Sequence, residues 1–392
     1  MTNRLKSILH IPHYFAKHPS RALVELYWAV GMNDLARASV SLFEPIYLYT
    51  IGYSVRQVIF FYLLVYGGYV LLLPFLGKLV GRLGFEHSIF YSQFFQIGYY
   101  LTLFGISKFS FLFFVSPFVF SIQKCLYWPA YHADFAVFSS DEQRGREVGG
   151  VETLSMMMFI VGPFIGGAIL EWTNFSVLFI VVAGLFILSA LPLLRIKEVH
   201  DRAEFSYRDV FKQLIDPRHR RNFAAYLGFG EELIVLSLWP IFIYVVIKDY
   251  LDIGAIVALA TLITSFIVLY LGRLTDKYKK EHIIRWGSIF YSLVWLLRTM
   301  ASGTWHVFGL DTSSRIAKEI LIVPLVATTY NNARKTGVLS YVVFYEQSIA
   351  ITKFFTAALL LLILQFVGTP WTAIFIVAAV FSLLYMLLKE NV

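Results

Sequence analysis

Charged side chains stand within long apolar stretches of this sequence, and their spacing places them on single faces of helices. Asp34, Arg37, Ser41 and Glu44 follow one another at steps of three, four and three residues, so they share one stripe of a helix. A carboxylate on such a stripe can exchange a proton when its surroundings change. A guanidinium beside it can neutralise that carboxylate or bind an anionic group.

Three further apolar stretches carry similar patterns. Adjacent acids on a helix point about 100° apart, so one can pair with a base while the other faces water. The members of these patterns are Lys124, Tyr127, Tyr131 and Asp134 in one stretch, Glu231 and Glu232 in the next, and Asp311, Arg315, Lys318 and Glu319 in the last.

The deepest of these ions form an electrically balanced set. A charge near the centre of a bilayer costs at least about 2.5–3.5 kcal/mol, so we expect the set to pair internally or to line a polar cavity. The alternative is that the ions only lock helices together, above all where Asp311, Arg315 and Glu319 follow at i, i+4 spacing. The acids are Asp34, Glu231, Glu232 and Glu319, and the bases are Arg37, Lys124, Arg315 and Lys318.

Composition places the chain in a membrane. It is 58% hydrophobic and 15% charged, whereas soluble domains have about 25% charged residues. Cys125 is the single cysteine, which excludes an intrachain disulfide. The sequence has no G-x-x-x-x-G-K-(S/T), C-x-x-C or H-E-x-x-H motif. We therefore expect no bound nucleotide, no metal site and no cofactor.

The apolar sequence divides into twelve stretches that can cross a bilayer as helices, each of which needs about 20 residues. Apolar and polar residues do not alternate within them, which argues against transmembrane strands. The predicted fold class is an all-α polytopic membrane protein with twelve transmembrane helices. Their predicted bounds are 22–50, 55–76, 87–106, 109–137, 146–171, 175–195, 222–247, 252–271, 283–302, 307–330, 339–366 and 370–388.

Basic residues in the connectors predict the orientation. Of the lysines and arginines in the connectors and at the adjoining ends of the spans, 24 fall on one side and three on the other. Because such an excess marks the cytoplasmic face, we expect both termini in the cytoplasm and the protein in the cytoplasmic (inner) membrane. The net charge of +8 is then a topology signal and a contact for anionic lipid in the bilayer, not a nucleic-acid surface.

The chain repeats itself at an offset of 195 residues, about half its length. GKLVGRLGFEH at 77–87 corresponds to GRLTDKYKKEH at 272–282, and Pro129 corresponds to Pro324. Two pseudo-symmetric six-helix halves in one orientation imply a site between them near the midplane. The predicted units are residues 1–195, a cytoplasmic linker over 196–221, and residues 222–392.

The linker itself has a helical signal. Phe211, Leu214 and Ile215 share one face at helical spacing and are flanked by bases. This pattern predicts a short helix that lies in the cytoplasmic membrane interface. The alternative is a plain charged linker.

These features together resemble the major facilitator superfamily over essentially all 392 residues. That family has a motif of the form G-x-L-x-D-(R/K)-x-G-(R/K)-(R/K) after its second helix, echoed after its eighth. The second copy here matches it with Gly272, Asp276 and Lys277. A second resemblance is Gly162-Pro163-Phe164-Ile165-Gly166-Gly167, which is similar to the family's helix 5 antiporter motif.

The first copy of the loop motif is incomplete. It keeps Gly77 and Arg82, but Gly81 replaces the acid. An acid at this position can pair with bases and with the N-terminus of a neighbouring helix. We therefore expect an asymmetric cytoplasmic gate centred on Asp276, and the alternative is that both loops are only tight connectors. The expected gate residues are Gly77, Arg82, Gly272, Asp276 and Lys277.

The resemblance also implies where the substrate binds. In this family helices 1, 4, 7 and 10 line the central cavity, and these are the predicted spans that carry the charges. Asp34 and Glu232 are the leading candidates for a proton carrier, and Arg37 and Lys124 for neutralising them or binding an anionic group. The expected cavity residues are Asp34, Arg37, Lys124, Tyr127, Tyr131, Glu231, Glu232, Arg315, Lys318 and Glu319.

The predicted function is secondary active transport of a small organic solute by alternating access. The helix 5 motif (Gly162, Pro163, Gly166 and Gly167) favours proton-coupled antiport and efflux, and we expect a functional monomer. A uniporter or importer of a sugar or organic anion is the alternative. A non-transporting sensor or a membrane-embedded enzyme is the rival class. An enzyme is disfavoured because the charges centre on the midplane and recur in both halves.

Overall fold

The computed structural model describes residues 21–138, 142–193, 207–277, 279–367 and 370–389, and this part of the chain is helical, without strands. For residues 21–26, 137, 138, 142–152, 193, 207, 209 and 268–277 it describes the backbone only. The first helices are α2 (Arg21–Val40), α3 (Glu44–Thr50), α4 (Val55–Leu83), α5 (Phe85–Gly105), α6 (Leu112–Phe138), α7 (Glu142–Trp172) and α8 (Phe175–Leu193).

The remaining helices begin with a short one in the linker and continue to the end of the described chain. They are α9 (Tyr207–Ile215), α10 (Arg220–Tyr226), α11 (Gly230–Leu233), α12 (Trp239–Ile247), α13 (Tyr250–Lys277), α14 (Lys280–Leu297), α15 (Thr304–Thr336), α16 (Val338–Ile363) and α17 (Pro370–Leu384).

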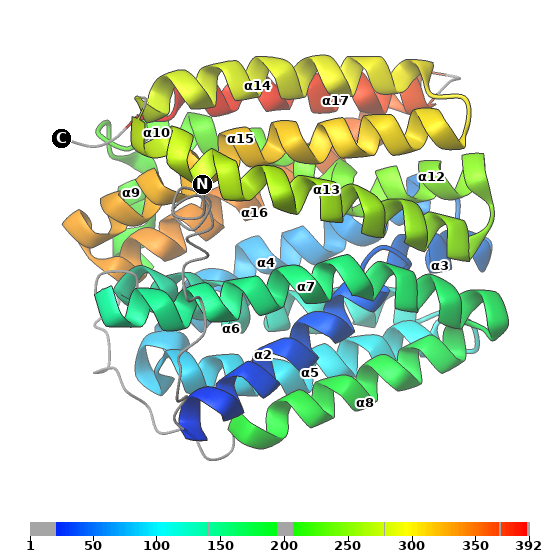
Figure 1. Ribbon diagram of the computed structural model, residues 1–392, viewed down its shortest axis with the longest axis horizontal. Coiled ribbons are helices and arrows are strands. Elements are labelled where there is room, and N and C mark those ends of the chain that lie inside the picture. Colours follow the sequence, from blue (N-terminus) through cyan, green and yellow to red (C-terminus); the bar gives the residue numbers. More distant parts are fainter. Residues whose placement is uncertain (1–20, 139–141, 194–206, 278, 368–369, 390–392) are drawn as a thin grey trace, which may run out of the picture.

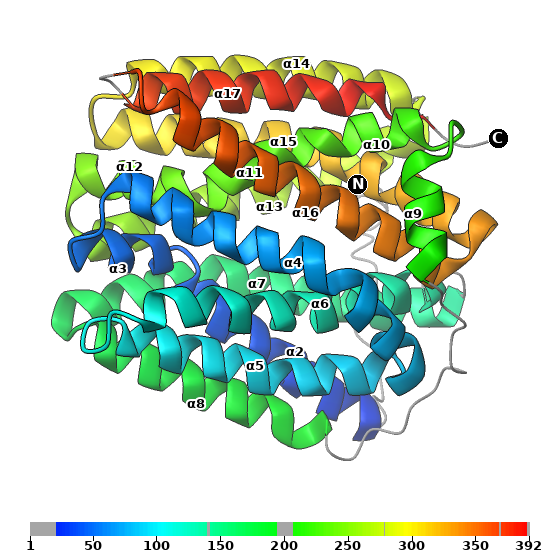
Figure 2. The same cartoon turned by 180° about the vertical axis from the view of Figure 1, so that it is seen from behind.

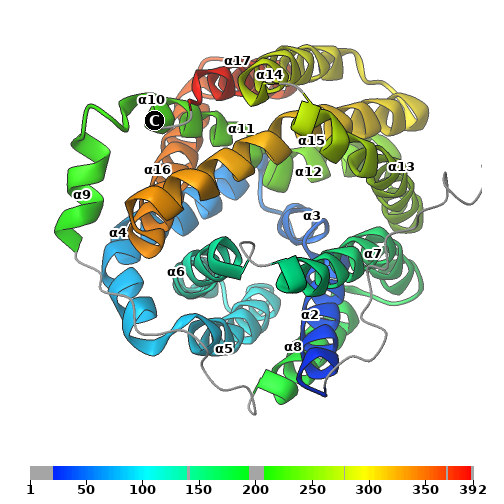
Figure 3. The same cartoon turned by 60° about the vertical axis from the view of Figure 1, so that its left-hand side comes forward.

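The helices form two groups that lie side by side. Helices α2 to α8 lie on one side of the molecule and α10 to α17 on the other (Figures 1 and 2). We refer to them as the first and second bundle. The bundles meet mainly where α4 packs on α16 and where α7 packs on α13 (Figure 3). Residues from both bundles therefore face each other along the middle of the molecule.

The first long helix of each bundle is interrupted just before a proline. A turn at residues 41–43 separates α2 from α3, which has Pro45 in its first turn. A turn of π-helix, Ile234–Leu238, precedes α12, which has Pro240 in its first turn. Proline fits there because the N–H that it lacks would be unbonded in any case. The prediction of one continuous helix over 22–50 is therefore wrong.

Over the residues that the structure describes, the repeated motif is mostly helical, which corrects its prediction as a loop. α4 continues to Leu83, so Gly77 and Arg82 lie in its last turns, and α13 continues to Lys277. Only Gly84, whose φ of 93° favours glycine, separates α4 from α5. The leucines, lysines and arginines of the motif are good helix formers, so its glycines alone do not end the helix.

Among the residues that the structure describes, seven helices are long and apolar enough to cross a membrane by length and composition. Other helices, such as α2 and α15, carry several charges. The molecule is therefore a multi-pass helical protein. The number of spans expected from the sequence stays a prediction.

A helix, α9, lies in the linker that the sequence placed between the halves. Phe211 and Ile215 are 53% and 71% exposed on it, whereas Leu214 is half-buried against the core, so only part of its apolar face is open. Just after α9 the half-buried Asp216 accepts hydrogen bonds from the guanidinium and the backbone of Arg218, which lower the pKa of Asp216 to about 2. The place of α9 at a membrane interface stays a prediction, and residues 194–206 of the linker lie outside the described chain.

Candidate functional site

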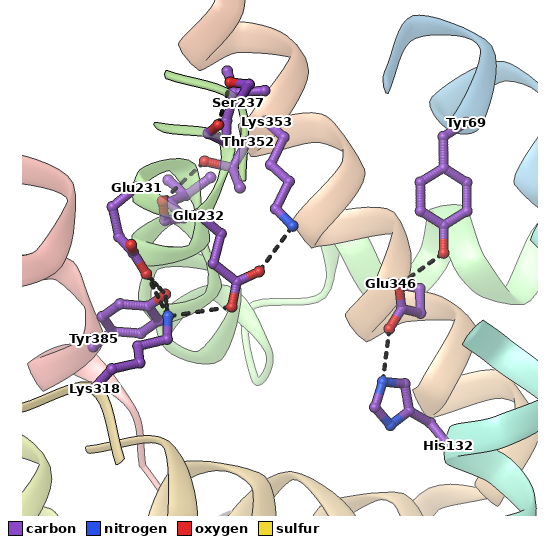
Figure 4. Close-up of polar contacts among 12 residues, drawn as sticks. Tyr69, His132, Glu231, Glu232, Ser237, Lys318, Glu346, Thr352, Lys353 and Tyr385 are labelled. Carbon is purple, nitrogen blue, oxygen red and sulfur yellow. Dashed lines mark hydrogen bonds and ion pairs between the residues drawn. The ribbon is translucent and has the colours of Figure 1, made fainter. Parts of the chain in front are cut away.

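Four side chains from three helices of the second bundle form an acid–base cluster: Glu231, Glu232, Lys318 and Lys353 (Figure 4). The Lys318 ammonium contacts both carboxylates, at 3.2 Å for Glu232. Lys353 donates to Glu232 Oε2 at 2.8 Å. The cluster ties α11 to α15 and α16, so three of its members, all but Lys353, are cavity candidates that the structure brings together.

The two acids of the cluster have different surroundings. The Glu231 side chain is 0% exposed, and it accepts hydrogen bonds from the hydroxyls of Tyr291 at 2.7 Å and Tyr385 at 2.9 Å. The Glu232 side chain is 26% exposed. Because Glu231 is enclosed and fully bonded, its role is to anchor Lys318. Glu232 is the acid of this cluster that water or a solute can reach.

The backbone around the two acids is irregular. They lie in the single turn of α11, between a 3₁₀ turn at Leu227–Phe229 and the π-helical turn at Ile234–Leu238. A π-turn widens a helix and is frequent at functional sites. This irregularity marks the helix that carries Glu231 and Glu232 as the one that is adapted to a site.

A second ion group surrounds Asp311. Its carboxylate accepts from Arg315 Nε at 2.7 Å and from Trp239 Nε1 at 2.8 Å, and the Arg298 guanidinium lies 3.9 Å away. Arg298 stacks between Trp239 and Trp295, with Cζ at 3.8 and 3.9 Å from the two ring centroids. Sequence analysis did not include Arg298 because it lies at the end of a predicted span, where an arginine is ordinary.

The expected ladder of three ions on α15 is corrected. Asp311 and Arg315 pair as the i, i+4 spacing predicts. Within the described chain, however, Glu319 makes no ion pair with Arg315 or with Lys318, because Arg315 turns back to Asp311 and Lys318 turns to the acid–base cluster. Glu319 is half-buried.

In the first bundle, Asp34 and Arg37 do not form an ion pair with each other. Asp34 accepts a hydrogen bond from Ser155 Oγ at 2.5 Å and one from Asn33 Nδ2 at 3.3 Å. The Arg37 guanidinium instead lies over Tyr127, with Cζ 4.5 Å from the ring centroid. Of the two expectations for the deep charges, internal pairing is therefore not met by Asp34 and Arg37, and their place in a polar cavity stays a prediction.

Lys124 also rests on aromatic rings. Its ammonium lies 4.4 Å from the Phe120 centroid and 5.7 Å from that of Tyr66. One turn further along α6, Tyr127 and Tyr131 stack with centroids 5.8 Å apart and planes 8° apart. The predicted stripe on α6 is therefore a row of aromatic rings between cationic side chains.

Glu44 is a buried acid that the sequence placed on the first stripe without assigning it a role. It accepts hydrogen bonds from Tyr99 at 3.1 Å and from Tyr100 at 2.5 Å. Both tyrosines come from α5, and both are buried. Adjacent tyrosines in an apolar span were the only signal for this contact. Their two hydroxyls satisfy the carboxylate without a base.

A hydrogen-bonded network joins the two bundles. Tyr69 of α4 donates to Glu346 Oε2 of α16 at 2.7 Å, and His132 Nε2 of α6 lies 3.2 Å from Glu346 Oε1 (Figure 4). The other nitrogen of His132 is 2.7 Å from the Tyr330 hydroxyl of α15. Nearby, Arg334 donates to the carbonyl of Ala136 at 3.0 Å. These contacts hold the C-terminal parts of α6 and α15 together.

Replacement of Glu346 by alanine is expected to lower the free energy of unfolding by about 1–3 kcal/mol, because Tyr69 and His132 lose a buried acceptor. Tyr69→Phe removes one hydrogen bond and should cost about 1 kcal/mol. Thermal unfolding in detergent measures both. Equal midpoints for Glu346→Ala and wild type would show that the network does not hold the bundles together.

The glycines of the helix 5 motif lie at close helix contacts. A Cβ at Gly162 would lie 2.4 Å from Ala38 Cβ, and one at Gly166 would lie 1.9 Å from the Ser39 carbonyl oxygen, both on α2. A Cβ at Gly167 would lie 2.4 Å from the Tyr250 carbonyl oxygen on α13. Pro163, on the same helix, presents its carbonyl to Gly254 of α13. The motif thus packs α7 against both bundles.

The expected gate residues are only partly described. Gly77 is buried and Arg82 is exposed near the end of α4. The side chains at positions 272, 276 and 277 lie outside the described residues, so nothing tests the gate centred on Asp276. Among the side chains that are described, no group of three or more His, Cys, Asp or Glu residues is placed to hold a metal ion.

The bundles, the charged middle and the helix contacts define a membrane transport protein. Residues 26–310 match the model of the Major Facilitator Superfamily, and the chain belongs to that family. It is therefore an integral multi-pass membrane protein, and its family is one of secondary transporters of small-molecule solutes, not of enzymes. No curated protein matches the sequence.

Solved structures show the same fold. One of them is the crystal structure of nucleoside transporter NupG, which has a TM-score of 0.69 and 12% sequence identity to this chain. The alignment covers 94% of this chain and 98% of that one. At this identity the likeness concerns the fold alone.

Proposed function

We propose that this protein is a proton-coupled antiporter that exports a small organic solute by alternating access. The observation that carries the proposal is Glu232, a partly exposed acid held by two lysines on a helix with a π-turn. Protonation of Glu232 removes its charge and weakens its contacts with Lys318 and Lys353. A solute that binds beside the cluster and favours one charge state of Glu232 is thereby coupled to the proton.

The architecture that we propose has twelve spans in two six-helix halves, residues 1–195 and 222–392. Both termini lie in the cytoplasm, and the protein functions as a monomer in the cytoplasmic (inner) membrane. Interrupted helices at Pro45 and Pro240, which are 195 residues apart, support the internal symmetry. The basic connectors support the orientation.

Alternating access requires that contacts between the bundles separate in turn. One set is the Tyr69–Glu346–His132 network. A second set lies at the start of α4 and the end of α16, where the Arg56 guanidinium donates to the Leu364 carbonyl. It also includes the contact between α3 and α12. We propose that the first set closes the cytoplasmic side and the second set the opposite side.

The test is proton movement by purified protein in proteoliposomes with a solute panel. Wild type is expected to show solute-dependent proton flux. Glu232→Gln and Asp34→Asn are each expected to reduce this flux by a factor of about ten or more, since each removes a carboxylate that can carry a proton. Glu171→Gln, at an exposed acid on α7, is the matched control. Solute transport without proton movement in wild type would overturn the coupling and indicate a uniporter.

A nucleoside is the second candidate solute. It is considered because NupG, which shares the fold over 94% of this chain, is a nucleoside transporter. Uridine therefore belongs in the solute panel. Uptake driven inward by an imposed proton gradient would indicate an importer instead of an efflux protein.

A further inference from the structure

We infer that Arg37 and Lys124 form the binding site for an oxyanion, so the solute is a small organic anion with a carboxylate or phosphate group. This inference names the substrate class of the transporter proposed above and rests on that proposal. Both side chains are enclosed by protein yet partly accessible. They come from α2 and α6 of the first bundle, and α6 packs on α16 of the second bundle.

The two bundles treat their deep cations differently. In the second bundle, each of Arg298, Arg315, Lys318 and Lys353 lies within 4 Å of a carboxylate oxygen. Throughout the described residues, neither Arg37 nor Lys124 has such a partner; both lie on aromatic faces instead. Among the described residues, the first bundle therefore holds two cations, Arg37 and Lys124, that form no ion pair with its acids.

The nearby acids are already satisfied by neutral donors. Asp34, which attracts Arg37 electrostatically, accepts from Ser155 and Asn33. Glu44, which attracts Lys124, accepts from Tyr99 and Tyr100. Glu346 attracts Lys124 as well, but it bonds Tyr69 and His132. These carboxylates reduce the repulsion among the cations without occupying their donors.

Aromatic faces do not replace a carboxylate. A cation–π contact contributes about 0.5–2 kcal/mol, whereas the desolvation of a buried ion costs several kcal/mol. Tyr127 lies beside the Arg37 guanidinium and also shares a hydrogen bond with it. A guanidinium has five N–H donors, so others remain that can bind an oxyanion, in bidentate geometry where two of them are adjacent. The ring beneath Lys124 covers one side of the ammonium.

The charges and rings also form a continuous arrangement. Lys124 is repelled by Arg37 and by Lys353, so both cations are near it, and Lys124 and Lys353 share the Tyr66 ring at 5.7 and 5.3 Å. An anion at Lys124 relieves this repulsion. It also lies close to the acid–base cluster through Lys353, which gives a physical link between solute and the charge of Glu232.

The stacked rings of α6 suit an organic body next to the anionic group. Trp128 lies 5.5 Å from the Arg37 Cζ, and the Tyr127–Tyr131 stack continues from it. An inorganic ion would not need such a surface. We therefore assign the site to an organic anion with a flat or apolar body.

The test compares charged solutes with neutral partners of the same shape. Benzoate is paired with benzamide, and uridine 5′-monophosphate with uridine, in thermal-shift and equilibrium-binding measurements on detergent-purified full chain. At least one anion is expected to raise the unfolding midpoint, and its neutral partner is not. Arg37→Gln and Lys124→Gln are each expected to weaken binding by about tenfold or more, the usual effect of losing a hydrogen bond to a charged group. Lys108→Gln, at an exposed loop lysine, is the control.

Charge-preserving variants keep the test valid if the glutamine variants do not fold. Arg37→Lys and Lys124→Arg retain the cation, so they are expected to retain measurable anion binding. Binding of the neutral partners alone, or anion binding unchanged in all four variants, would overturn the assignment while the transporter proposal stands. Failure of every anion in the panel to bind would also overturn it. Anion binding through Arg37 and Lys124 without any transport would instead overturn the transporter proposal alone.

Discussion

Glu231→Ala is expected to lower the free energy of unfolding by about 3–5 kcal/mol, which is the usual effect of removing one partner from a buried ion pair. The substitution leaves the hydroxyls of Tyr291 and Tyr385 without their acceptor, and it leaves Lys318 with Glu232 as its single carboxylate. Because the Glu231 side chain is 0% exposed, water cannot replace the lost contacts.

A second variant separates the ion pair from simple loss of volume. Glu231→Ala combined with Lys318→Met removes both charges, and it is expected to recover part of the lost stability, because an apolar pair avoids an uncompensated buried charge. Thermal unfolding in detergent gives the midpoints. Glu171→Ala, at an exposed acid, should change stability by no more than about 0.5 kcal/mol. A double variant that is less stable than the single one would contradict the ion-pair account.

Much of the helical organisation could be predicted because membrane helices follow simple rules. Long apolar stretches give their positions, and the repeat at 195 residues predicts two similar halves. The interruptions at Pro45 and Pro240 were not predicted, although the two prolines have the same offset. The ends were less predictable. Glycines and charges suggested a loop at 77–87, but α4 extends to Leu83, since good helix formers continue a helix beyond the apolar stretch.

Single residues of the site were harder to predict than the faces on which they lie. Helical spacing placed Arg37 and Asp34 on one stripe. The stripe does not reveal that Ser155 of α7 donates a hydrogen bond to Asp34 or that Tyr127 lies beside Arg37. Partners from other helices depend on packing, which periodicity does not contain. The same limit explains why Arg298 was not expected beside Asp311.

The two bundles also differ in how their charged side chains pair, and this difference could not be predicted from the sequence. Counting acids and bases indicated a neutral set that pairs internally or lines a polar cavity, without saying which residues do either. The structure pairs Lys318 and Lys353 but leaves Arg37 and Lys124 on rings. Overall neutrality therefore does not fix local neutrality, and the local excess of cations is what indicates a binding site for an anion.

Gly167→Ala is expected to reduce transport at least about tenfold and to destabilise the protein by about 1–3 kcal/mol, the usual effect of overpacking. An added Cβ would lie 2.4 Å from the Tyr250 carbonyl oxygen and 3.3 Å from Gly254 Cα, so α7 and α13 must move apart. Since α13 belongs to the other bundle, the substitution acts on the contact along which the bundles must move.

Two other glycines test whether that effect belongs to the contact between bundles. In Gly166→Ala the added Cβ would lie 1.9 Å from the Ser39 carbonyl oxygen, within the first bundle. This variant is expected to be less stable, but the protein that does fold is expected to transport at the normal rate. Gly184 of α8 has nothing within 4 Å, and Gly184→Ala should be neutral or up to about 1 kcal/mol stabilising because alanine favours the helix. Proteoliposome transport per folded protein, with unfolding midpoints beside it, distinguishes the three. If Gly166→Ala and Gly167→Ala slowed transport equally at equal stability, the α7–α13 contact would have no separate role, and the glycines would serve packing alone.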